Sequence, residues 1–331
     1  MNASDIFPVN ETSPTRDRDF FIIGGLYIFI TLSGIIGNTI VILAVVFSKA
    51  LRTACNVFIV NLAVADLLTC LVLPLYVLAF WTDYRPYLDK VCFAALSVSY
   101  TTIGCSIYTL ASISVIRYFL IVSPSKNYYT AVTKPGVFVV WISLVWIIPI
   151  FVTLFPPVVF DIGELAFDAK PHACQPHTRH PRTDLYNSLI VYAYYPVPLV
   201  ILLLAYSGIL VQVMRHRRPM SNQITTPSTS SPQRLFSIFF SVDSNPSNLG
   251  HRRPSRSRLA MQLKITRNMF IIFLAFIVCL TPHAVCHILH CKRAKFYAKA
   301  FVLFNSMVNP LLYGISHPQF RKAFADALRS T

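Results

Sequence analysis

The chain has 331 residues, of which 55% are hydrophobic and 13% are charged, and its mean hydropathy is +0.57. This composition is far more apolar than that of soluble globular or disordered proteins, and it favours an integral membrane protein. The net charge of +16 does not indicate a nucleic-acid-binding protein, because Lys and Arg lie in short segments between long apolar runs. Anionic lipid headgroups and a protein partner explain these basic segments better.

Seven apolar stretches are long enough to cross a bilayer as helices. They cover residues 20–47, 56–80, 89–122, 135–156, 186–214, 262–289 and 296–315. Because backbone polar groups in lipid must be hydrogen-bonded within the protein, the predicted fold is an all-α, seven-transmembrane helix bundle. An odd number of crossings places the two ends of the chain on opposite sides of the membrane.

Two short terminal segments flank the predicted bundle, which covers residues 20–315. Residues 1–19 are polar and lack the pattern of a signal peptide, so the first apolar stretch is expected to direct insertion. Residues 316–331 contain Phe320 and Phe324 at helical spacing, with basic residues between them. This pattern predicts a short amphipathic eighth helix on the inner surface of the membrane.

The predicted orientation in the plasma membrane has the N-terminus outside the cell. Lys and Arg are then more numerous in the loops that face the cytoplasm, mainly because of the third inner loop. Two sequons, at Asn2 and Asn10, precede the first span and predict N-glycosylation of an extracellular tail.

The third inner loop, residues 215–262, is rich in Ser, Thr, Pro and Arg and is predicted to be disordered. Two arginines and a proline directly before Ser255 make this residue a candidate phosphorylation site for a basophilic kinase. A charge run that only solubilises the loop explains the same residues equally well.

Polar side chains inside the predicted spans are costly in lipid, so each is a functional candidate. One set is expected to meet in a buried polar cluster: Asn38, Asp66, Ser106, Asn305, Ser306 and Asn309. Oxygen ligands around a lone carboxylate suit a small hard cation, and sodium is the abundant extracellular candidate. A protonated Asp66 that is hydrogen-bonded to Asn309 and water explains the same residues, and the sequence does not choose between the two.

A series of short motifs now gives a resemblance to a known family. The motifs are Gly37-Asn38, Leu62 to Asp66, Arg117-Tyr118, Trp141, Pro198 with Tyr206, Pro282, and Asn309-Pro-Leu-Leu-Tyr313. In this order, on seven helices, they resemble the landmarks of rhodopsin-like (class A) G-protein-coupled receptors. Within that class, Ser114 to Ile121 and Arg267 to Pro282 are most similar to the melatonin-receptor, medium-chain fatty-acid receptor and insect Moody/Trapped-in-endoderm group.

The resemblance implies a plasma-membrane receptor without enzymatic activity. It implies a disulfide between Cys92 and Cys174, which would hold the second outer loop over the ligand cavity. The residues implied in coupling to the G protein are Arg117, Tyr118, Tyr206 and Tyr313. The implied partners are a small extracellular ligand, membrane lipids, a heterotrimeric G protein of the inhibitory class, arrestin and receptor kinases, with no nucleic acid among them.

Two positions depart from the family pattern. Most relatives have an acidic residue before the arginine of the inner motif, where this chain has Ile116. Arg117 then lacks its nearest anion, which predicts measurable basal activity. Most relatives have a tryptophan at the floor of the pocket, where this chain has Leu280, while Pro282 still predicts a kink in the sixth span.

The same resemblance disfavours two ligand classes. Amine receptors need an aspartate in the outer third of the third span, and the corresponding residue is Ser99. Retinal opsins need a lysine in the seventh span, and the corresponding residue is Leu303.

The outer half of the predicted bundle is basic. The candidate pocket residues are Ser99, Tyr100, His283, His287, His290, Lys295 and Lys299. The three histidines share a helical face, as do the two lysines, so an acid ligand held by Lys299 or Lys295 is expected. Three alternatives stay open, namely zinc binding by the histidines, proton sensing, and ordinary polar residues near a membrane surface.

Two further functional classes are weighed against a signalling receptor. A transporter or channel is disfavoured because neither an inverted repeat nor a charged pathway along several spans is visible in the sequence. A non-signalling scavenger or decoy receptor stays compatible with Ile116 and Leu280. No nucleophile with an aligned base, phosphate loop or complete metal site appears, so neither an enzyme nor a required cofactor is expected.

Overall fold

The computed structural model describes residues 14–81, 85–122, 134–168, 173–221, 254–289, 291–316 and 320–321. Its elements are α1 (Pro14–Phe47), η2 (Lys49–Leu51), α2 (Ala54–Trp81), α3 (Arg85–Val122), α5 (Pro135–Phe160), β1 (Leu165–Asp168), β2 (Ala173–Pro176), α6 (Thr183–Tyr194), α7 (Pro196–Ser221), α9 (Pro254–Ile288) and α10 (Lys292–Ser316). The predicted sites Asn2, Asn10 and His290 lie outside the described residues. Ser255 and Lys295 are described only as helical backbone.

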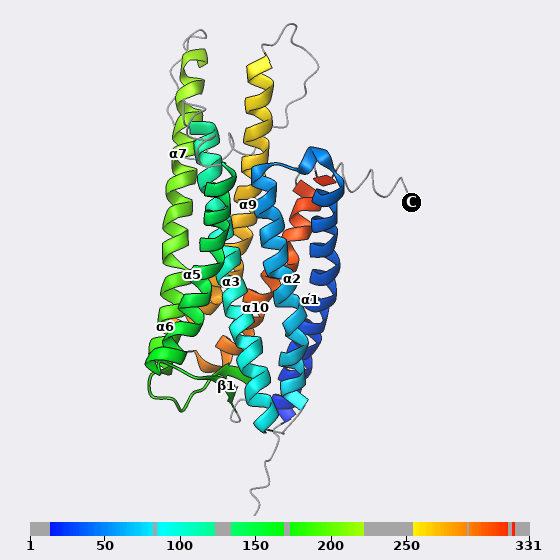
Figure 1. Ribbon diagram of the computed structural model, residues 1–331, viewed down its shortest axis with the longest axis vertical. Coiled ribbons are helices and arrows are strands. Elements are labelled where there is room, and N and C mark those ends of the chain that lie inside the picture. Colours follow the sequence, from blue (N-terminus) through cyan, green and yellow to red (C-terminus); the bar gives the residue numbers. More distant parts are fainter. Residues whose placement is uncertain are drawn as a thin grey trace, which may run out of the picture.

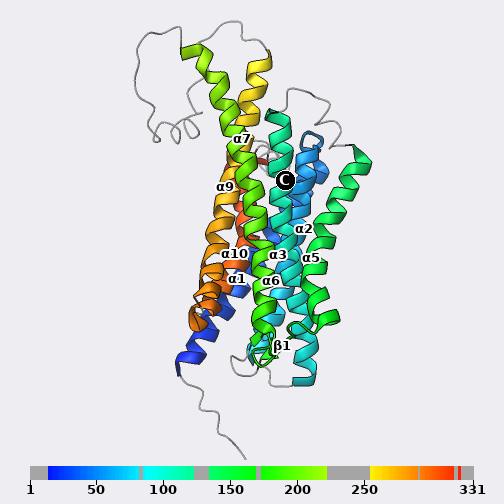
Figure 2. The same ribbon diagram turned by 90° about the vertical axis from the view of Figure 1, so that its left-hand side faces the viewer.

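The long helices lie side by side in an elongated bundle (Figure 1). The β hairpin and the first turns of α1 lie at one end, here called the hairpin end. The last turns of α7 and the first turns of α9 project from the opposite end, here called the α7–α9 end (Figures 1 and 2). The seven-helix fold predicted from the sequence is therefore confirmed, with α6 and α7 together forming the fifth span.

Six segments of the described chain are long and apolar enough to cross a membrane. The seventh helix, α10, begins with several lysines and is more polar, but it packs against α1 and α9 and completes the bundle. Large apolar side chains cover the outer surface, with exposed fractions of 67% for Leu204 and Val278. A soluble protein rarely exposes such a surface, so the bundle has the exterior of a multi-pass membrane protein.

The fifth span is broken at Tyr195, which the sequence did not predict. Tyr195 still donates its backbone N–H to the carbonyl of Val191 at 3.0 Å, and its own carbonyl accepts from Leu199 at 3.2 Å. Pro196 follows directly, and a proline lacks an N–H and disfavours helical geometry in the residue before it. These constraints explain why α6 and α7 meet here with a local irregularity.

The segment predicted to be disordered is helical at both ends. The helix α7 continues to Ser221, and α9 begins at Pro254, so the prediction for residues 215–262 was wrong for these flanking parts. Basic residues such as Arg217 have good helix propensity, and a proline suits the first turn of a helix. Residues 222–253 lie outside the described chain.

Short strands β1 and β2 form an antiparallel hairpin, with Phe167 opposite Cys174. The backbone N–H of Phe167 donates to the carboxylate of Asp89 on α3 at 3.3 Å. The buried carboxylate of Asp168 accepts from the Thr178 backbone N–H at 3.0 Å and from the Gln175 amide at 3.1 Å. These contacts hold the hairpin against the end of the bundle.

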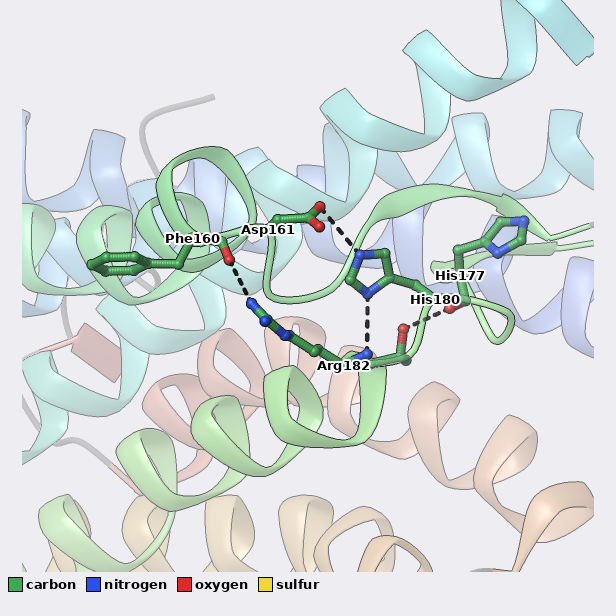
Figure 3. Close-up of polar contacts among 6 residues, drawn as sticks. Phe160, Asp161, His177, His180 and Arg182 are labelled. Carbon is green, nitrogen blue, oxygen red and sulfur yellow. Dashed lines mark hydrogen bonds and ion pairs between the residues drawn. The ribbon is translucent and has the colours of Figure 1, made fainter.

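The turn between β2 and α6 is tied to the end of α5 (Figure 3). His180 Nε2 lies 3.2 Å from the carboxylate of Asp161, and His180 Nδ1 accepts the backbone N–H of Arg182 at 3.3 Å. The Arg182 guanidinium donates to the carbonyl of Phe160 at 3.1 Å. Because Nδ1 accepts a hydrogen bond, Nε2 carries the ring proton and donates to Asp161.

Candidate functional site

A cavity of about 60 Å³ lies between α3, α6, α9 and α10, in the half of the bundle nearer the hairpin end. Its walls are mostly apolar or aromatic, as is usual for small-molecule sites. The lining residues are Ser99, Tyr100, Ile103, Ile190, Val191, Tyr194, Tyr195, Leu280, His283, Ala284, Lys299, Val302 and Leu303. Lys299 and His283 are the basic side chains of this lining, and none of the lining residues carries a carboxylate.

Lys299 links three parts of the cavity. Its Nζ atom donates a hydrogen bond to the backbone carbonyl of Cys174 in β2 at 3.1 Å. The same atom lies 4.5 Å from the centre of the Tyr76 ring on α2, which is the geometry of a cation–π contact. Both of these partners are uncharged.

The structure places four of the predicted pocket residues around this cavity: Ser99, Tyr100, His283 and Lys299. His287 instead lies against α6, where its Nε2 is 3.3 Å from the hydroxyl of Ser188. His283 and His287 were predicted to share one face of the helix, but His283 lines the cavity and His287 contacts α6. Within the described residues, no group of three or more His, Cys, Asp and Glu side chains gathers to hold a metal ion.

Sequence reasoning missed the wall that α6 contributes. Tyr194 lines the cavity, and its hydroxyl is fixed by the Thr153 hydroxyl at 2.9 Å and by the carbonyl of Pro149 at 3.1 Å. The Tyr195 hydroxyl lies 3.0 Å from that of Thr281 on α9. Two adjacent tyrosines directly before a proline, in an apolar span, were the available signal for this wall.

The predicted disulfide between Cys92 and Cys174 is present, and the two Cα atoms are 5.0 Å apart. It joins the N-terminal part of α3 to β2. Because the carbonyl of Cys174 also accepts from Lys299, the bridge and this hydrogen bond together hold β2 between α3 and α10 at the hairpin end.

The predicted polar cluster forms around Asp66, which is 1% exposed. Asn309 donates its amide N–H to one carboxylate oxygen at 2.7 Å, and the Ser106 hydroxyl donates to the other at 3.2 Å. A side-chain hydrogen bond from Ser306 reaches the same carboxyl group. Asn38 connects α1 to this cluster, because its amide donates to the backbone carbonyl of Ser306 at 2.9 Å.

Three amide oxygens in this region have no hydrogen-bond partner among the described residues: Asn38 Oδ1, Asn305 Oδ1 and Asn309 Oδ1. Buried polar atoms normally have a partner, which is often an ordered water or an ion. A carboxylate with nearby hydroxyl and amide oxygens is the donor set that a small hard cation prefers. The residues present therefore fit a sodium ion with water.

The side chains predicted to contact a G protein lie toward the α7–α9 end. Arg117, five residues before the end of α3, is 4% exposed. Tyr206 packs on α9, with its ring centre 5.0 Å from that of Phe270 and 6.1 Å from that of Phe273. The ring of Tyr206 is therefore covered by α9.

The two remaining coupling residues pack against neighbouring elements. Tyr118 lies against α7 at Gly208, where a Cβ atom would come within 3.0 Å of the tyrosine ring. Tyr313 is 1% exposed, and its ring stacks on Phe320 at 5.4 Å. Phe320 is fully buried and helical, although the rest of the predicted eighth helix, apart from Arg321, is not described.

The two departures from the family pattern are both buried. Ile116 is fully buried in the core, beside Arg117. Leu280 is 8% exposed and lines the cavity, so it does occupy the predicted position in the pocket. Pro282 lies inside α9, and the Thr281 hydroxyl donates to the carbonyl of Ile277 at 2.7 Å in the same turn.

Residues 37–313 match the profile of the family described as 7 transmembrane receptor (rhodopsin family). The chain belongs to this family of rhodopsin-like, G-protein-coupled receptors. The receptor is 25% identical over 305 residues to Protein trapped in endoderm-1 of Drosophila melanogaster, covering 90% of this chain and 74% of that protein. It is 30% identical over 337 residues to the human 5-hydroxytryptamine receptor 1B, covering 92% of this chain and 85% of that protein.

The solved structure of squid rhodopsin supports the fold. It superposes on the receptor with a TM-score of 0.72, at 21% sequence identity, over 95% of this chain and 86% of that one. Family membership makes this chain a non-enzymatic, multi-pass membrane protein of a receptor family that couples to G proteins, as the sequence motifs predicted.

Proposed function

We propose that this receptor lies in the plasma membrane with its hairpin end outside, binds a small acidic ligand in the cavity beside Lys299, and activates inhibitory-class G proteins. The observation that carries the ligand class is the cavity lining, in which Lys299 and His283 are basic and none of the residues is acidic.

The orientation is supported by the disulfide at the hairpin end. Disulfides persist in oxidising compartments and are rare in the cytosol. The bridge between Cys92 and Cys174 therefore faces the exterior, and the α7–α9 end faces the cytoplasm. The N-terminus, at the hairpin end of α1, is then extracellular.

An acid group suits the ammonium of Lys299. A carboxylate, phosphate or sulfate carries a negative charge, so it attracts an ammonium more strongly than a neutral carbonyl or an aromatic ring does. Lys299 contacts a carbonyl and a ring at the edge of the cavity, and an anion in the cavity would add a stronger interaction to these contacts. Tyr100 and His283 line the same cavity and are suitable further donors.

The ligands named in two relatives fit this cavity less well. The 5-hydroxytryptamine receptor 1B is named for an amine, whose ammonium needs a carboxylate, whereas Ser99 lines the cavity at the corresponding position. Another relative, from Mizuhopecten yessoensis, is named Rhodopsin, GQ-coupled, and is 27% identical over 329 residues. Leu303 lines the cavity where an opsin needs its retinal-binding lysine.

Activation of the G protein requires a movement of α9. Arg117 is buried, and Tyr206 is covered by Phe270 and Phe273 of α9. A ligand that favours an outward position of α9 would expose Arg117, Tyr206 and neighbouring residues to the G protein. Arrestin and receptor kinases would bind the same activated state.

Two further properties are part of the proposal. Basal activity follows from Ile116, because this position carries no acidic side chain, whereas most relatives have one there that pairs with the arginine in the resting state. An allosteric sodium ion would bind at Asp66, with Ser106, Asn305 and Asn309 supplying hydroxyl and amide oxygens.

G-protein activation without added ligand tests the signalling part of the proposal. The wild-type receptor and Arg117→Glu are expressed at matched surface levels and assayed across the main Gα classes. We expect activation of inhibitory-class Gα by the wild type only. Signal through another class would overturn the inhibitory assignment.

A panel of small carboxylates, sulfates and phosphate esters, each paired with its neutral amide or ester, tests the ligand class. We expect an acidic compound to activate the wild type, its neutral counterpart to fail, and Lys299→Gln to lose the response. Lys90→Gln, a change of an exposed lysine near the hairpin-end terminus of α3, is the matched control and should respond normally. An unchanged response of Lys299→Gln to an acidic agonist would overturn the proposal.

The departures at Ile116 and Leu280 favour one second candidate, a scavenger receptor that binds the ligand but does not signal. This candidate predicts specific binding of the acidic compound with no Gα activation in any class. A binding assay run beside the activation assay separates the two functions.

A further inference from the structure

The eight cysteines of the receptor fall into three groups. Cys92 and Cys174 are bonded to each other, and four others are buried free thiols inside the spans: Cys55, Cys70, Cys105 and Cys279. Cys286 and Cys291 are the remaining two; they are also free thiols in this structure, and both are partly exposed. They lie at the end of α9 and in the connection to α10, at the hairpin end (Figure 1).

A backbone hydrogen bond brings these two residues together. The N–H of Cys291 donates to the carbonyl of Cys286 at 3.0 Å. Many helices end with a backbone hydrogen bond of this kind, which joins the first and the last of six consecutive residues. The side chains of these two residues often touch each other. The helix α9 ends at Ile288, between the two cysteines.

The hydrogen bond keeps the two cysteines close to the separation that a disulfide needs. Even if every bond along the path were fully extended, standard backbone lengths and this hydrogen bond would keep the two Cα atoms within about 7 Å of each other. Disulfides need Cα atoms at roughly 4.4–6.8 Å. The Cys291 thiol lies just after the end of α9, 3.7 Å from the carbonyl of Leu289.

We propose that Cys286 and Cys291 form a second disulfide in the mature receptor. The hairpin end already carries one disulfide, so the same compartment can oxidise this pair. A dithiol oxidase or another protein disulfide accepts the electrons. One thiolate attacks that disulfide and releases a thiolate, and the second cysteine then attacks the mixed disulfide. The products are the new S–S bond and the reduced dithiol.

The bridge would fix the junction between α9 and α10. Cys286 lies next to His287, which contacts α6 through Ser188, and α10 carries Lys299 two turns after its start. Bridging the two cysteines therefore limits how far the first turn of α10 can move away from the last turn of α9. This restraint acts on the cavity wall and needs neither a ligand nor a G protein.

Thiol mapping on the full receptor in native membranes tests the proposal. Free thiols are blocked with N-ethylmaleimide before solubilisation, and the protein is denatured, reduced and labelled with an isotopic form of the same reagent. Tandem mass spectrometry then assigns the label at each cysteine. We expect Cys286 and Cys291 to carry only the second label, as Cys92 and Cys174 do.

Single variants supply the matched controls. Cys286→Ser should leave Cys291 with the first label, and Cys291→Ser should do the same for Cys286, while Cys279→Ser should leave the pattern unchanged. The proposal is overturned if the wild type carries the first label at Cys286 and Cys291 while Cys92 and Cys174 carry only the second. That result would leave the proposed ligand and G protein untouched.

Discussion

The Nζ atom of Lys299 lies 3.1 Å from the carbonyl oxygen of Cys174, so α10 is hydrogen-bonded to the strand that the disulfide attaches to α3. The same ammonium group lies on the Tyr76 ring of α2. One side chain thus connects three elements around the cavity, and it has a structural role as well as the proposed role in ligand binding.

Lys299→Gln should lower the stability of the ligand-free receptor. A hydrogen bond from a charged group contributes about 1.5–3 kcal/mol, and a partly exposed cation–π contact adds about 0.5–1 kcal/mol. Part of this loss is offset because the variant no longer has to desolvate an ammonium group. We therefore expect the free energy of unfolding to fall by about 1–2 kcal/mol. The unfolding temperature in detergent measures the loss, with Lys90→Gln as the control. Equal stability of the two variants would show that the contact to Cys174 is not maintained.

Sodium should stabilise the receptor through Asp66. An ion that binds only the folded state stabilises it by about 1.4 kcal/mol at ten times its dissociation constant. We expect a higher unfolding temperature in sodium chloride than in N-methylglucamine chloride at equal ionic strength. Asp66→Asn should remove this difference in unfolding temperature. Ser97→Ala is the control, because it changes a buried hydroxyl on α3 that has no hydrogen-bond partner among the described residues, and it should retain the difference. A sodium effect that persists in Asp66→Asn would place the ion elsewhere.

Ile116→Asp should reduce agonist-independent signalling. The new carboxylate would lie beside Arg117 in the buried interior, where an opposite charge stabilises the resting position of the guanidinium. A coupling of this kind is worth about 1–3 kcal/mol, so we expect at least about a fivefold decrease in basal Gα activation. Ile116→Asn has a similar shape without the charge and should decrease the signal less. A silent wild type, together with no effect of Ile116→Asp, would contradict the proposed basal activity.

The seven helices were predictable because each depends on a local property, the length of an apolar run. The break at Tyr195 was not predictable, because the presence of Pro196 alone does not show whether a helix bends, ends or continues. The hairpin was not predictable either, since β1 has only four residues and is held by distant partners such as Asp89 and the disulfide. Contacts between distant segments leave no periodic pattern in the sequence.

In the candidate site, too, the features that depend on local spacing were predictable, and those that depend on contacts between distant segments were not. Lys299 and His283 could be placed near the cavity because their depth in a predicted span is fixed by residue spacing. Helical spacing also put His287 on the face of His283, but the histidines are four residues apart and meet different neighbours. Tyr194 was missed because the position of its ring depends on the break that follows it.

Gly104 on α3 packs closely against Tyr194, one of the residues that line the cavity. A Cβ atom there would come within 2.6 Å of the Tyr194 ring and within 2.9 Å of Pro149 Cβ. Neither neighbour can move easily, because the Tyr194 hydroxyl is hydrogen-bonded to Thr153 and to the carbonyl of Pro149. The lack of a side chain at Gly104 is therefore what allows α3, α5 and α6 to approach one another.

Gly104→Ala should destabilise the receptor by about 1–3 kcal/mol, the usual cost of an extra methyl group in a packed core. Gly25→Ala is the matched control, because Gly25 is also helical and a Cβ atom there meets nothing within 4 Å. The control should be unchanged or more stable by up to about 1 kcal/mol, since alanine favours helices over glycine. Unfolding temperatures measure both effects. If the two alanine variants unfold at the same temperature, α3 does not approach Tyr194 and Pro149 as closely as this structure shows.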